Sequence, residues 1–241
     1  MCGLWKYYSK CIKGEGHKER DMLCQDRVLY KTMDHRQAIV LVDGIGQTDT
    51  NIIAGEKVAE YAADYLLENF DEILQQKAMD IKTHILKAVR HIIKKMTDAF
   101  ELPYEEFAST LMVLCIDNDS ELYCGIHLGD GIMVCKDNGF KVLSYPTNGL
   151  ERRKTCLTIS EGAFEEMKIL KGRIQGISEI ILMSDGTYEY PLDKGQLLES
   201  IETLSDENAG ESREDDQGII LLRRNEDAQV EKRRQNIHKI G

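Results

Sequence analysis

The sequence lacks the features that mark several large classes of protein. It contains 3 prolines and 1 tryptophan in 241 residues, and no apolar run approaches the roughly 20 residues that span a bilayer. The first residues also lack the long apolar segment of a secretory signal peptide. We therefore expect a cytoplasmic protein with no membrane partner.

Basic residues are fewer than acidic residues. The chain has 31 basic and 42 acidic residues, which give a formal net charge of −11. Because nucleic acid and anionic membranes repel such a chain, neither is expected as a partner. With 42% hydrophobic and 30% charged residues, the composition is that of an ordinary globular protein.

Cysteine pairs of the kind that hold zinc are absent. The 7 cysteines are scattered without a Cys-x-x-Cys pair, a pattern typical of reduced thiols rather than of a disulfide framework or a zinc site. No break in composition divides the chain. We therefore predict a single domain over residues 1–241, present as a monomer, in which residues 225–241 form a charged C-terminal tail.

Hydrophobic periodicity indicates two long helices in a chain that is otherwise rich in strands. A spacing of 3.6 between apolar residues predicts helices over Ile53–Leu74 and Met79–Phe100. A short helix is expected over Gln196–Leu204, followed by an exposed loop over Ser205–Asp216. Strands are predicted at Trp5–Ile12, Val28–Thr32, Ala38–Val42, Ser109–Ile116, Glu121–Leu128, Ile132–Lys136, Phe140–Ser144, Cys156–Ile159, Glu166–Arg173, Ser178–Met183 and Gly218–Arg223. Such a chain favours a sandwich in which helices pack outside paired sheets.

Acidic residues stand at the ends of several of these strands. Asp43-Gly44, Asp130-Gly131 and Asp185-Gly186 each follow an apolar run, and Asp215-Asp216 precedes another. Asp-Gly is also the favoured hairpin turn, but only the pair at 130–131 is followed by a plausible strand. Carboxylates gathered at one end of a β core must bind cations or titrate abnormally, because like charges at short range cannot all stay ionised. The pattern therefore predicts a polynuclear metal site.

One further acidic motif completes an ordered series. Gly14-Glu15-Gly16-His17 and Cys24-Gln25-Asp26 lie ahead of the first core strand. The series continues with Val42–Gly46, Ala108–Thr110, Leu128–Gly131, Met183–Gly186 and Asp215-Asp216. In order and spacing it resembles the protein phosphatase 2C family of metal-dependent serine/threonine phosphatases, and in particular the short bacterial-type members. The resemblance extends from residue 14 to residue 222.

The resemblance implies a fold, a metal centre and a reaction. The fold would be α+β, a four-layer α-β-β-α sandwich with two central, mostly antiparallel sheets flanked by helices. Two Mn²⁺ or Mg²⁺ ions, with a third and weaker one, would lie between the sheets, and a water shared by two cations would attack phosphorus. The implied metal ligands are Asp26, Asp43, Gly44 through its carbonyl, Asp130, Asp185 and Asp215. The substrate would be a phosphorylated protein, and the enzyme would oppose a serine/threonine kinase.

Other side chains are assigned to catalysis and substrate binding with the family pattern in view. Asp43, Asp185 and His17 are the expected catalytic residues, and His17 and Arg20 are expected to bind substrate. His17 as a structural histidine is an equal alternative. Because side chains alternate along an extended segment, only one residue of Asp215-Asp216 is expected to reach the metals, and the family register favours Asp215.

The sequence departs from the family pattern at three positions. Ile45 stands where many members carry a histidine that protonates the leaving group. Asp21 stands where many carry a phosphate-binding arginine, and Gln25 replaces a glutamate found in some relatives. A pseudophosphatase that acts as a regulatory binding module is therefore a second hypothesis, although unused buried carboxylates would be costly. A hydrolase of small phosphoesters is a third.

Overall fold

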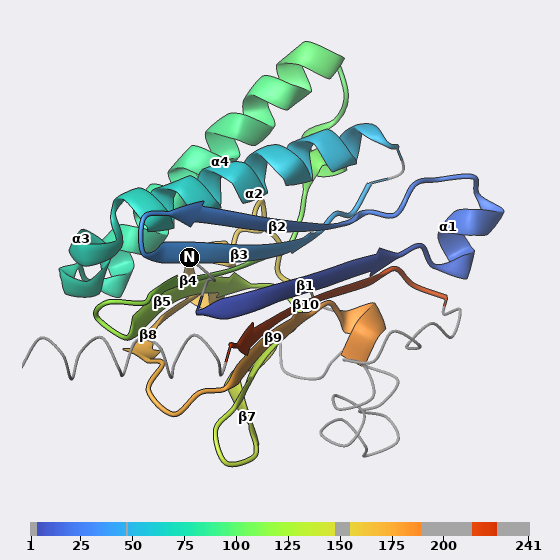
Figure 1. Ribbon diagram of the computed structural model, residues 1–241. Helices are drawn as coiled ribbons and strands as arrows, with labels where there is room; N and C mark the ends of the chain where they lie inside the picture. Colours follow the sequence, from blue (N-terminus) through green and yellow to red (C-terminus); the bar gives the residue numbers. More distant parts are fainter. Residues whose placement is uncertain (1–3, 47, 148–154, 189–213, 226–241) are drawn as a thin grey trace, which may run out of the picture.

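Ten antiparallel strands form two sheets in the part of the chain that the computed structural model describes, residues 4–46, 48–147, 155–188 and 214–225 (Figure 1). The first sheet has the strand order β2-β3-β4-β5-β8, and the second has the order β1-β10-β9-β6-β7. Strands of the first sheet are β2 (Asp26–Met33), β3 (Arg36–Asp43), β4 (Leu111–Asp117), β5 (Leu122–Leu128) and β8 (Lys168–Arg173). Strands of the second sheet are β1 (Trp5–Ile12), β10 (Gln217–Arg224), β9 (Glu179–Met183), β6 (Ile132–Lys136) and β7 (Phe140–Ser144).

The helices cover the outer face of the first sheet. The two long ones are α2 (Thr50–Glu68) and α4 (Ala78–Phe100), and α3 (Phe70–Gln75) joins them. The shorter elements are α1 (Glu15–Glu19), the 3-10 helix η1 (Tyr104–Phe107) and α5 (Ala163–Glu166). None of the helices among the described residues combines the length and apolar character that crossing a bilayer requires.

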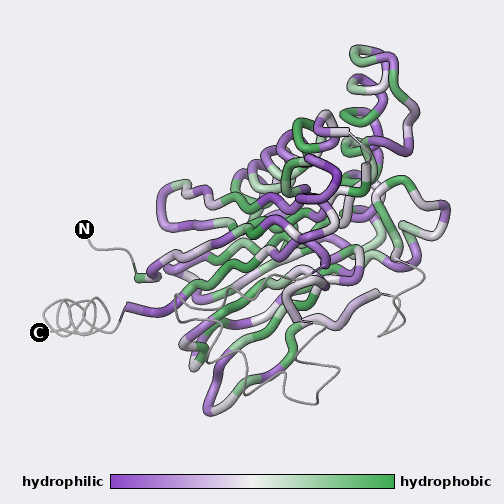
Figure 2. Tube along the Cα trace, turned by 90° about the vertical axis from the view of Figure 1, so that its right-hand side faces the viewer, coloured by the Kyte–Doolittle hydropathy of each residue, from purple (hydrophilic) through white to green (hydrophobic). Residues whose placement is uncertain are grey.

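The central strand β3 shows why the sequences of the core strands are unbroken runs of apolar residues. Val40 and Val42 pack with the helices, whereas Ile39 and Leu41 pack between the two sheets. Because successive side chains of a strand point to opposite faces, both sets are apolar only where both faces are covered. Figure 2 shows the same effect, with hydrophobic stretches following the strands through the middle of the molecule.

The outer face of the second sheet is also apolar. Val134, Ile181 and Met183 form a buried cluster there, together with Tyr188. A helical turn begins at Asp185 and leads into residues that the structure does not describe. The predicted α+β sandwich with two antiparallel sheets and helices is confirmed.

Several local predictions are wrong. The predicted helix over Ile53–Leu74 is broken at Asn69, whose side chain and backbone N–H both donate to the Tyr65 carbonyl at 2.9 and 3.1 Å and end α2 there. The predicted strand at Cys156–Ile159 is a turn, because the Ser160 hydroxyl accepts the Leu157 N–H at 3.0 Å. Glu166 belongs to α5 rather than to the next strand.

Other local predictions fall on residues that the structure does not describe. The predicted helix Gln196–Leu204, the loop over residues 205–213 and residues 226–241 of the predicted tail lie outside the described residues. The short helix α1, which follows β1, was not predicted at all.

Candidate metal centre

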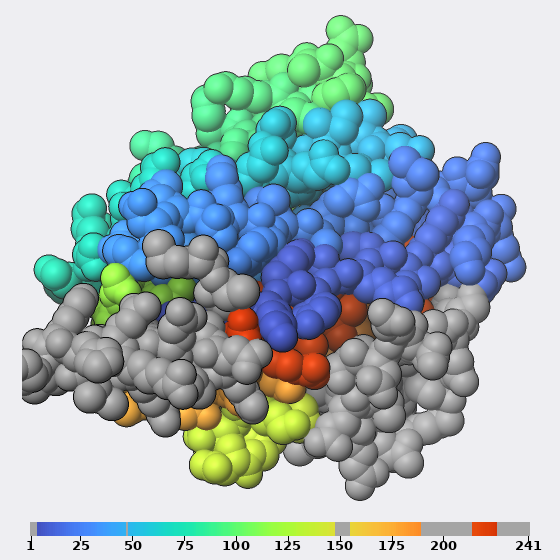
Figure 3. Space-filling model, in the orientation of Figure 1, coloured from blue at the N-terminus to red at the C-terminus, as the bar shows by residue number. Residues whose placement is uncertain are grey.

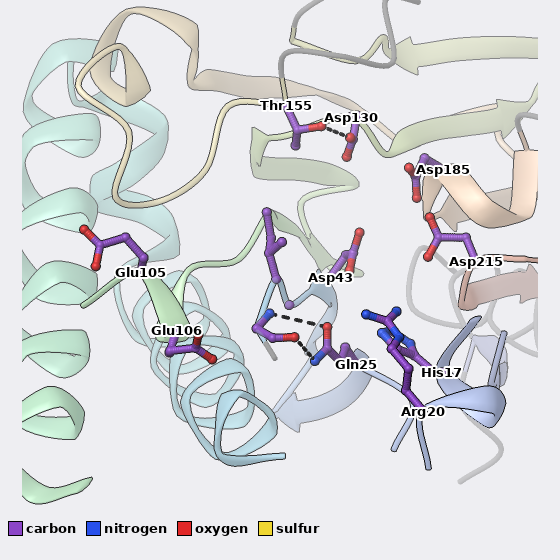
Figure 4. A pocket seen from close by; sticks show the side chains of 13 residues that line it. His17, Arg20, Gln25, Asp43, Glu105, Glu106, Asp130, Thr155, Asp185 and Asp215 are labelled. Atoms are coloured by element: carbon purple, nitrogen blue, oxygen red, sulfur yellow. Dashed lines mark hydrogen bonds between the residues drawn. The ribbon is translucent and has the colours of Figure 1, made fainter. Parts of the chain in front are cut away.

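Three aspartates from separate strand ends converge at one end of the sandwich. Asp43 is the last residue of β3, Asp130 lies in the turn between β5 and β6, and Asp185 directly follows β9. One carboxylate oxygen from each lies within 4.8 Å of the other two. Figure 4 shows Asp215 beside them, at the start of the segment that leads into β10. Gly44 lines the same pocket, so the sheets bring together five of the six predicted metal residues, all but Asp26.

Backbone pairing holds Asp43 in place. The Thr110 N–H donates to the Asp43 carbonyl at 2.9 Å, and the Asp43 N–H donates to the Thr110 hydroxyl at 2.9 Å. Both backbone polar groups are therefore satisfied within the sheet, and the carboxylate is left to face the pocket. The Ala108–Thr110 motif thus has a structural role at this strand end.

The cluster carries more negative charge than it can stabilise alone. Burial, and then the charges of the neighbouring aspartates, raise the pKa of Asp43 well above its usual range. The strongest of these neighbours are Asp26 and Asp185. Burial also raises the pKa of Asp130, while a hydrogen bond from the Thr155 hydroxyl opposes that shift. Hard oxygen donors that repel one another in this way fit divalent cations such as Mg²⁺ or Mn²⁺.

Asp26 lies behind this cluster rather than in it. It pairs with Asp43 across β2 and β3, is fully buried, and does not line the pocket. Its Oδ2 accepts a hydrogen bond from the Ser184 hydroxyl at 2.7 Å, whereas its Oδ1 has no protein partner. Burial is the main cause that raises the pKa of Asp26 well above its usual range. An orphaned buried oxygen of this kind would be satisfied by a water or an ion.

Asp215 and Asp216 point in different directions. Asp215 is exposed and lines the pocket. Asp216 is buried, and its carboxylate accepts the backbone N–H groups of Gly14 and Gln25 and faces Nδ1 of His17 at 2.9 Å. Asp216 therefore ties the start of β10 to the segment that carries α1.

Two basic side chains face the aspartates from the opposite wall. His17 and Arg20 come from α1 and its C-terminal end, and both line the pocket (Figure 4). Asp216 engages Nδ1 of His17, which leaves Nε2 as the ring nitrogen available to a ligand. The Nε of Arg20 donates to the Gly16 carbonyl at 2.9 Å. Lys18, also near the predicted site, instead pairs with Glu15 at 2.7 Å.

These walls enclose a pocket of about 450 Å³. Its lining residues are His17, Arg20, Gln25, Asp43, Gly44, Ile45, Gly46, Glu105, Glu106, Asp130, Thr155, Asp185 and Asp215. The volume is large enough for a phosphorylated side chain together with the ions that the aspartates would hold.

The comparisons with known proteins agree with this geometry. The sequence model of the family described as Protein phosphatase 2C matches residues 13–216. The chain belongs to the protein phosphatase 2C family. This family consists of metal-dependent phosphatases, and the chain is a serine/threonine phosphatase at the level of its family. No curated protein is similar enough in sequence to count as a match.

Solved structures of the same fold are distant in sequence. The S. agalactiae serine/threonine phosphatase is 12% identical over 92% of this chain and 100% of that chain, with a TM-score of 0.65. PppA, a key regulatory component of T6SS in Pseudomonas aeruginosa, is 13% identical over 92% and 98%, with a TM-score of 0.61. RsbX in complex with magnesium is 16% identical over 92% and 96%, with a TM-score of 0.53.

The position where many family members carry histidine is open to the pocket here. Ile45 is 46% exposed and lines the cavity, so this wall presents an aliphatic side chain. The neighbouring Gly44 also lines the cavity, and a Cβ there would lie 2.4 Å from the end of the Asn51 side-chain amide. Only glycine leaves room for the turn between β3 and α2.

Sequence reasoning missed the residues that shape this turn and the far wall. Asn51 is buried, and with its oxygen facing the turn it accepts the N–H groups of Ile45 and Gly46 at 2.8 and 2.7 Å. Its position in the first turn of α2 was the available signal. Glu105 and Glu106 on η1 line the far wall without belonging to any motif. The Gln25 side chain closes the turn by donating to the Gly46 carbonyl at 2.7 Å.

Proposed function

We propose that the protein is a phosphoserine/phosphothreonine protein phosphatase that uses two divalent cations, Mn²⁺ or Mg²⁺, to hydrolyse phosphomonoesters. The single observation that supports this most strongly is the convergence of Asp43, Asp130 and Asp185 within 4.8 Å at the floor of the pocket. The substrate would be a phosphorylated protein in the cytoplasm, and the enzyme would oppose a serine/threonine kinase.

The donor set suits this pair of metals. Asp43, Asp185, Asp215 and the Gly44 carbonyl would hold two cations, and Asp130 would contribute to a third, weaker site. All of these ligands are oxygens, which Mg²⁺ and Mn²⁺ prefer, and the open pocket leaves room for the waters that these ions retain. Bound there, the cations supply the charge that activates a water molecule and neutralises the phosphoryl oxygens.

The protein contributes substrate orientation on the opposite wall. Arg20 is exposed at the rim and carries a permanent charge that can bind a phosphoryl oxygen in bidentate fashion. His17 is fixed through Nδ1 by Asp216 and can donate a proton from Nε2 to the departing serine or threonine oxygen when it is protonated. Both roles remain proposals, and His17 fills the place that Ile45 leaves without an acid.

Phosphate release from a phosphothreonine peptide tests the function. The purified full chain should release phosphate with Mn²⁺ and stop when EDTA removes the metal, because the water is activated only by bound cations. A phosphotyrosine peptide of the same sequence is the matched control and should react far more slowly. Phosphate release that EDTA leaves unchanged would rule out the dinuclear mechanism.

The same assay separates the competing functions. Mn²⁺ binding measured by calorimetry without any phosphate release would favour the pseudophosphatase that acts as a binding module. Hydrolysis of nitrophenyl phosphate or nucleotides, but of no peptide, would favour a hydrolase of small phosphoesters. No observation on the structure favours either of these over the protein phosphatase.

A further inference from the structure

Two cysteine side chains lie next to each other at the edge of the sandwich, outside the acidic cluster. Cys11 is near the end of β1, and Cys24 lies just before β2. These are edge strands of the two sheets, and they run side by side on the face shown in Figure 3. Tyr7 stacks on Tyr30 with ring centroids 4.4 Å apart, so Cys11, four residues after Tyr7 in β1, faces β2.

The two thiols are close enough for a hydrogen bond between them. The register of β1 agrees, because Cys11 pairs with Gly218. A Cβ at Gly218 would lie 2.7 Å from Oδ2 of Asp26. The Cys24 sulfur lies 3.9 Å from the Asp26 carbonyl oxygen. The Cys24 sulfur therefore lies beside Asp26, and Cys11 pairs with the glycine that packs against the Asp26 carboxylate.

Solvent can reach this pair. Cys11 is exposed and Cys24 is partly buried. A thiolate is the form of cysteine that attacks oxidants. Among the described residues no third metal-binding side chain completes a group with these two sulfurs, which favours thiol chemistry over a zinc site.

We propose that Cys11 and Cys24 form a reversible disulfide when the protein meets a peroxide, and that the bond weakens the metal centre. The effect on catalysis rests on the proposed phosphatase function, whereas the disulfide itself does not. Of the described cysteines, only this pair combines an exposed thiol with a neighbouring one: Cys115 and Cys124 pair across β4 and β5 but are completely buried.

The chemistry needs only a peroxide as co-reactant. The Cys11 thiolate attacks one peroxide oxygen, the O–O bond breaks, and hydroxide or alkoxide leaves and takes up a proton. The sulfenic acid formed on Cys11 is then attacked by the Cys24 sulfur. The S–S bond forms, the S–O bond breaks, and water leaves with the Cys24 proton. The two sulfurs together lose two electrons, which the peroxide gains.

The Cys11–Cys24 disulfide would change the pocket through the hydrogen bonds of Gln25. This residue follows Cys24, its N–H donates to Asp216, and its side chain donates to the Gly46 carbonyl. A disulfide holds its sulfurs about 2.05 Å apart, which is shorter than any hydrogen bond between thiols. Closing the bond therefore pulls the segment before β2 toward β1. That motion disturbs the contacts that fix His17 and the turn at Gly44.

Mass spectrometry of the full chain tests the bond. The reduced protein is treated with hydrogen peroxide, alkylated and cut with trypsin, which separates residues 11–13 from residues 21–27. We expect these two peptides to be joined and to lose the mass of two hydrogen atoms. In Cys24→Ser the bridge should be absent and Cys11 should carry added oxygen. Cys115 and Cys124 are the internal control and should be alkylated only after unfolding.

The second measurement is Mn²⁺ affinity in the reduced and oxidised protein. We expect about 10-fold weaker binding after oxidation, the low end of the effect of disturbing residues behind metal ligands. Phosphate release should fall in parallel, and dithiothreitol should restore both. Cys11→Ser should behave like the reduced protein before and after peroxide.

The outcomes are separable. Alkylation of both thiols after peroxide, or a bridge from either one to Cys2, would overturn the proposal. A Cys11–Cys24 bridge with unchanged Mn²⁺ affinity would overturn its link to the metal centre. If the reduced protein releases no phosphate, the proposed function fails, while the bridge and the Mn²⁺ affinity still decide this inference.

Discussion

Asp215 and Asp216 are neighbours in the chain that face different parts of the molecule. Asp215 faces the pocket, whereas Asp216 is 3% exposed and accepts hydrogen bonds from the segment around α1. Strand alternation was enough to predict that the two side chains diverge. It could not reveal that Asp216 also holds His17, because that contact joins opposite ends of the chain.

The two aspartates should therefore differ when each is replaced by alanine. Asp215→Ala should weaken Mn²⁺ binding and lower kcat with little change in the free energy of unfolding. Asp216→Ala leaves two buried N–H donors without an acceptor, at about 1–3 kcal/mol each, and frees His17. We expect that variant to be less stable by about 3 kcal/mol but to retain more of its metal affinity. Calorimetric Mn²⁺ titration and urea unfolding measure both effects, and the reverse ranking in Mn²⁺ affinity would mean that Asp216 is the ligand.

At the scale of elements, the start of α2 sets the shape of the metal site. Asn51, in its first turn, accepts the N–H groups of Ile45 and Gly46. Asn51→Ala would remove this shared acceptor and leave the Ile45 N–H with the Ala108 carbonyl at 3.0 Å and the Gly46 N–H with Oε1 of Gln25 at 3.4 Å. The turn would be held by fewer hydrogen bonds, so we expect a lower melting temperature and weaker Mn²⁺ binding. Asn69→Ala at the other end of the same helix is the matched control, because it also loses a hydrogen bond but lies far from the pocket. Equal Mn²⁺ affinity in the two variants would contradict this role.

The same element shows where sequence reasoning stops. The apolar spacing of α2 and α4 predicted both helices, since each buries one face against β3, β4 or a neighbouring helix. At the break, the side chain and the backbone N–H of Asn69 both donate to the Tyr65 carbonyl and cap the end of α2. The turn at 156–159 depends on Ser160 and on the distant Ser109 carbonyl, which accepts the Thr158 N–H at 3.0 Å. Neither contact leaves a periodic signal.

Strand β5 carries a buried histidine that makes stability depend on pH. His127 is 0% exposed, its Nδ1 lies 2.6 Å from the Ser144 hydroxyl, and its Nε2 has no protein partner. Burial, and then the charge of Lys168, lower the pKa of His127 to about 3. The unfolded chain, with a histidine pKa of about 6.5, therefore binds this proton more readily than the folded protein. Stability is lost as the pH falls from about 6.5 toward the folded value.

The substitution His127→Asn isolates this contribution. Asparagine can still hydrogen-bond to Ser144 but does not titrate. Between about pH 6.5 and 5, the wild type should lose up to about 2 kcal/mol more unfolding free energy than the variant. Urea unfolding across this range, with exposed His91→Asn on α4 as the control, measures the difference. Parallel curves for His127→Asn and the wild type would show that folding does not lower the pKa of His127.

At the scale of the whole molecule, the metal centre joins the two sheets. Asp43 comes from the first sheet, Asp185 and Asp215 from the second, and Asp130 from the turn between them. Cations bound by this cluster would therefore hold the sheets together, whereas charge repulsion within the empty cluster would push them apart. The motif order predicted this convergence. It could not predict that Asp26 would lie behind the cluster, since the depth of a residue between sheets depends on packing.

Neutral variants should separate these two effects. Asp43→Asn and Asp185→Asn each remove one charge, so the metal-free protein should melt at a higher temperature than the wild type. Both should lose phosphate release and most of the stabilisation by Mn²⁺, which for the wild type is about 2.7 kcal/mol at 100 times the Kd. Thermal melts with and without Mn²⁺ measure this, with exposed Asp98→Asn on α4 as the control. Near-normal turnover in either variant would contradict the assignment.

The strand order β1-β10-β9 has a consequence for the newly made protein. As the chain leaves the ribosome, β1 emerges first, yet its neighbour in the sheet is the last described strand to be synthesised. The Asp216 carboxylate that anchors Gly14 arrives equally late. Strands β2 to β5 of the first sheet can pair during translation, since all four are complete by residue 128, whereas β8 follows later. The second sheet must wait, so the nascent protein holds an incomplete set of the proposed metal ligands until translation reaches residue 215.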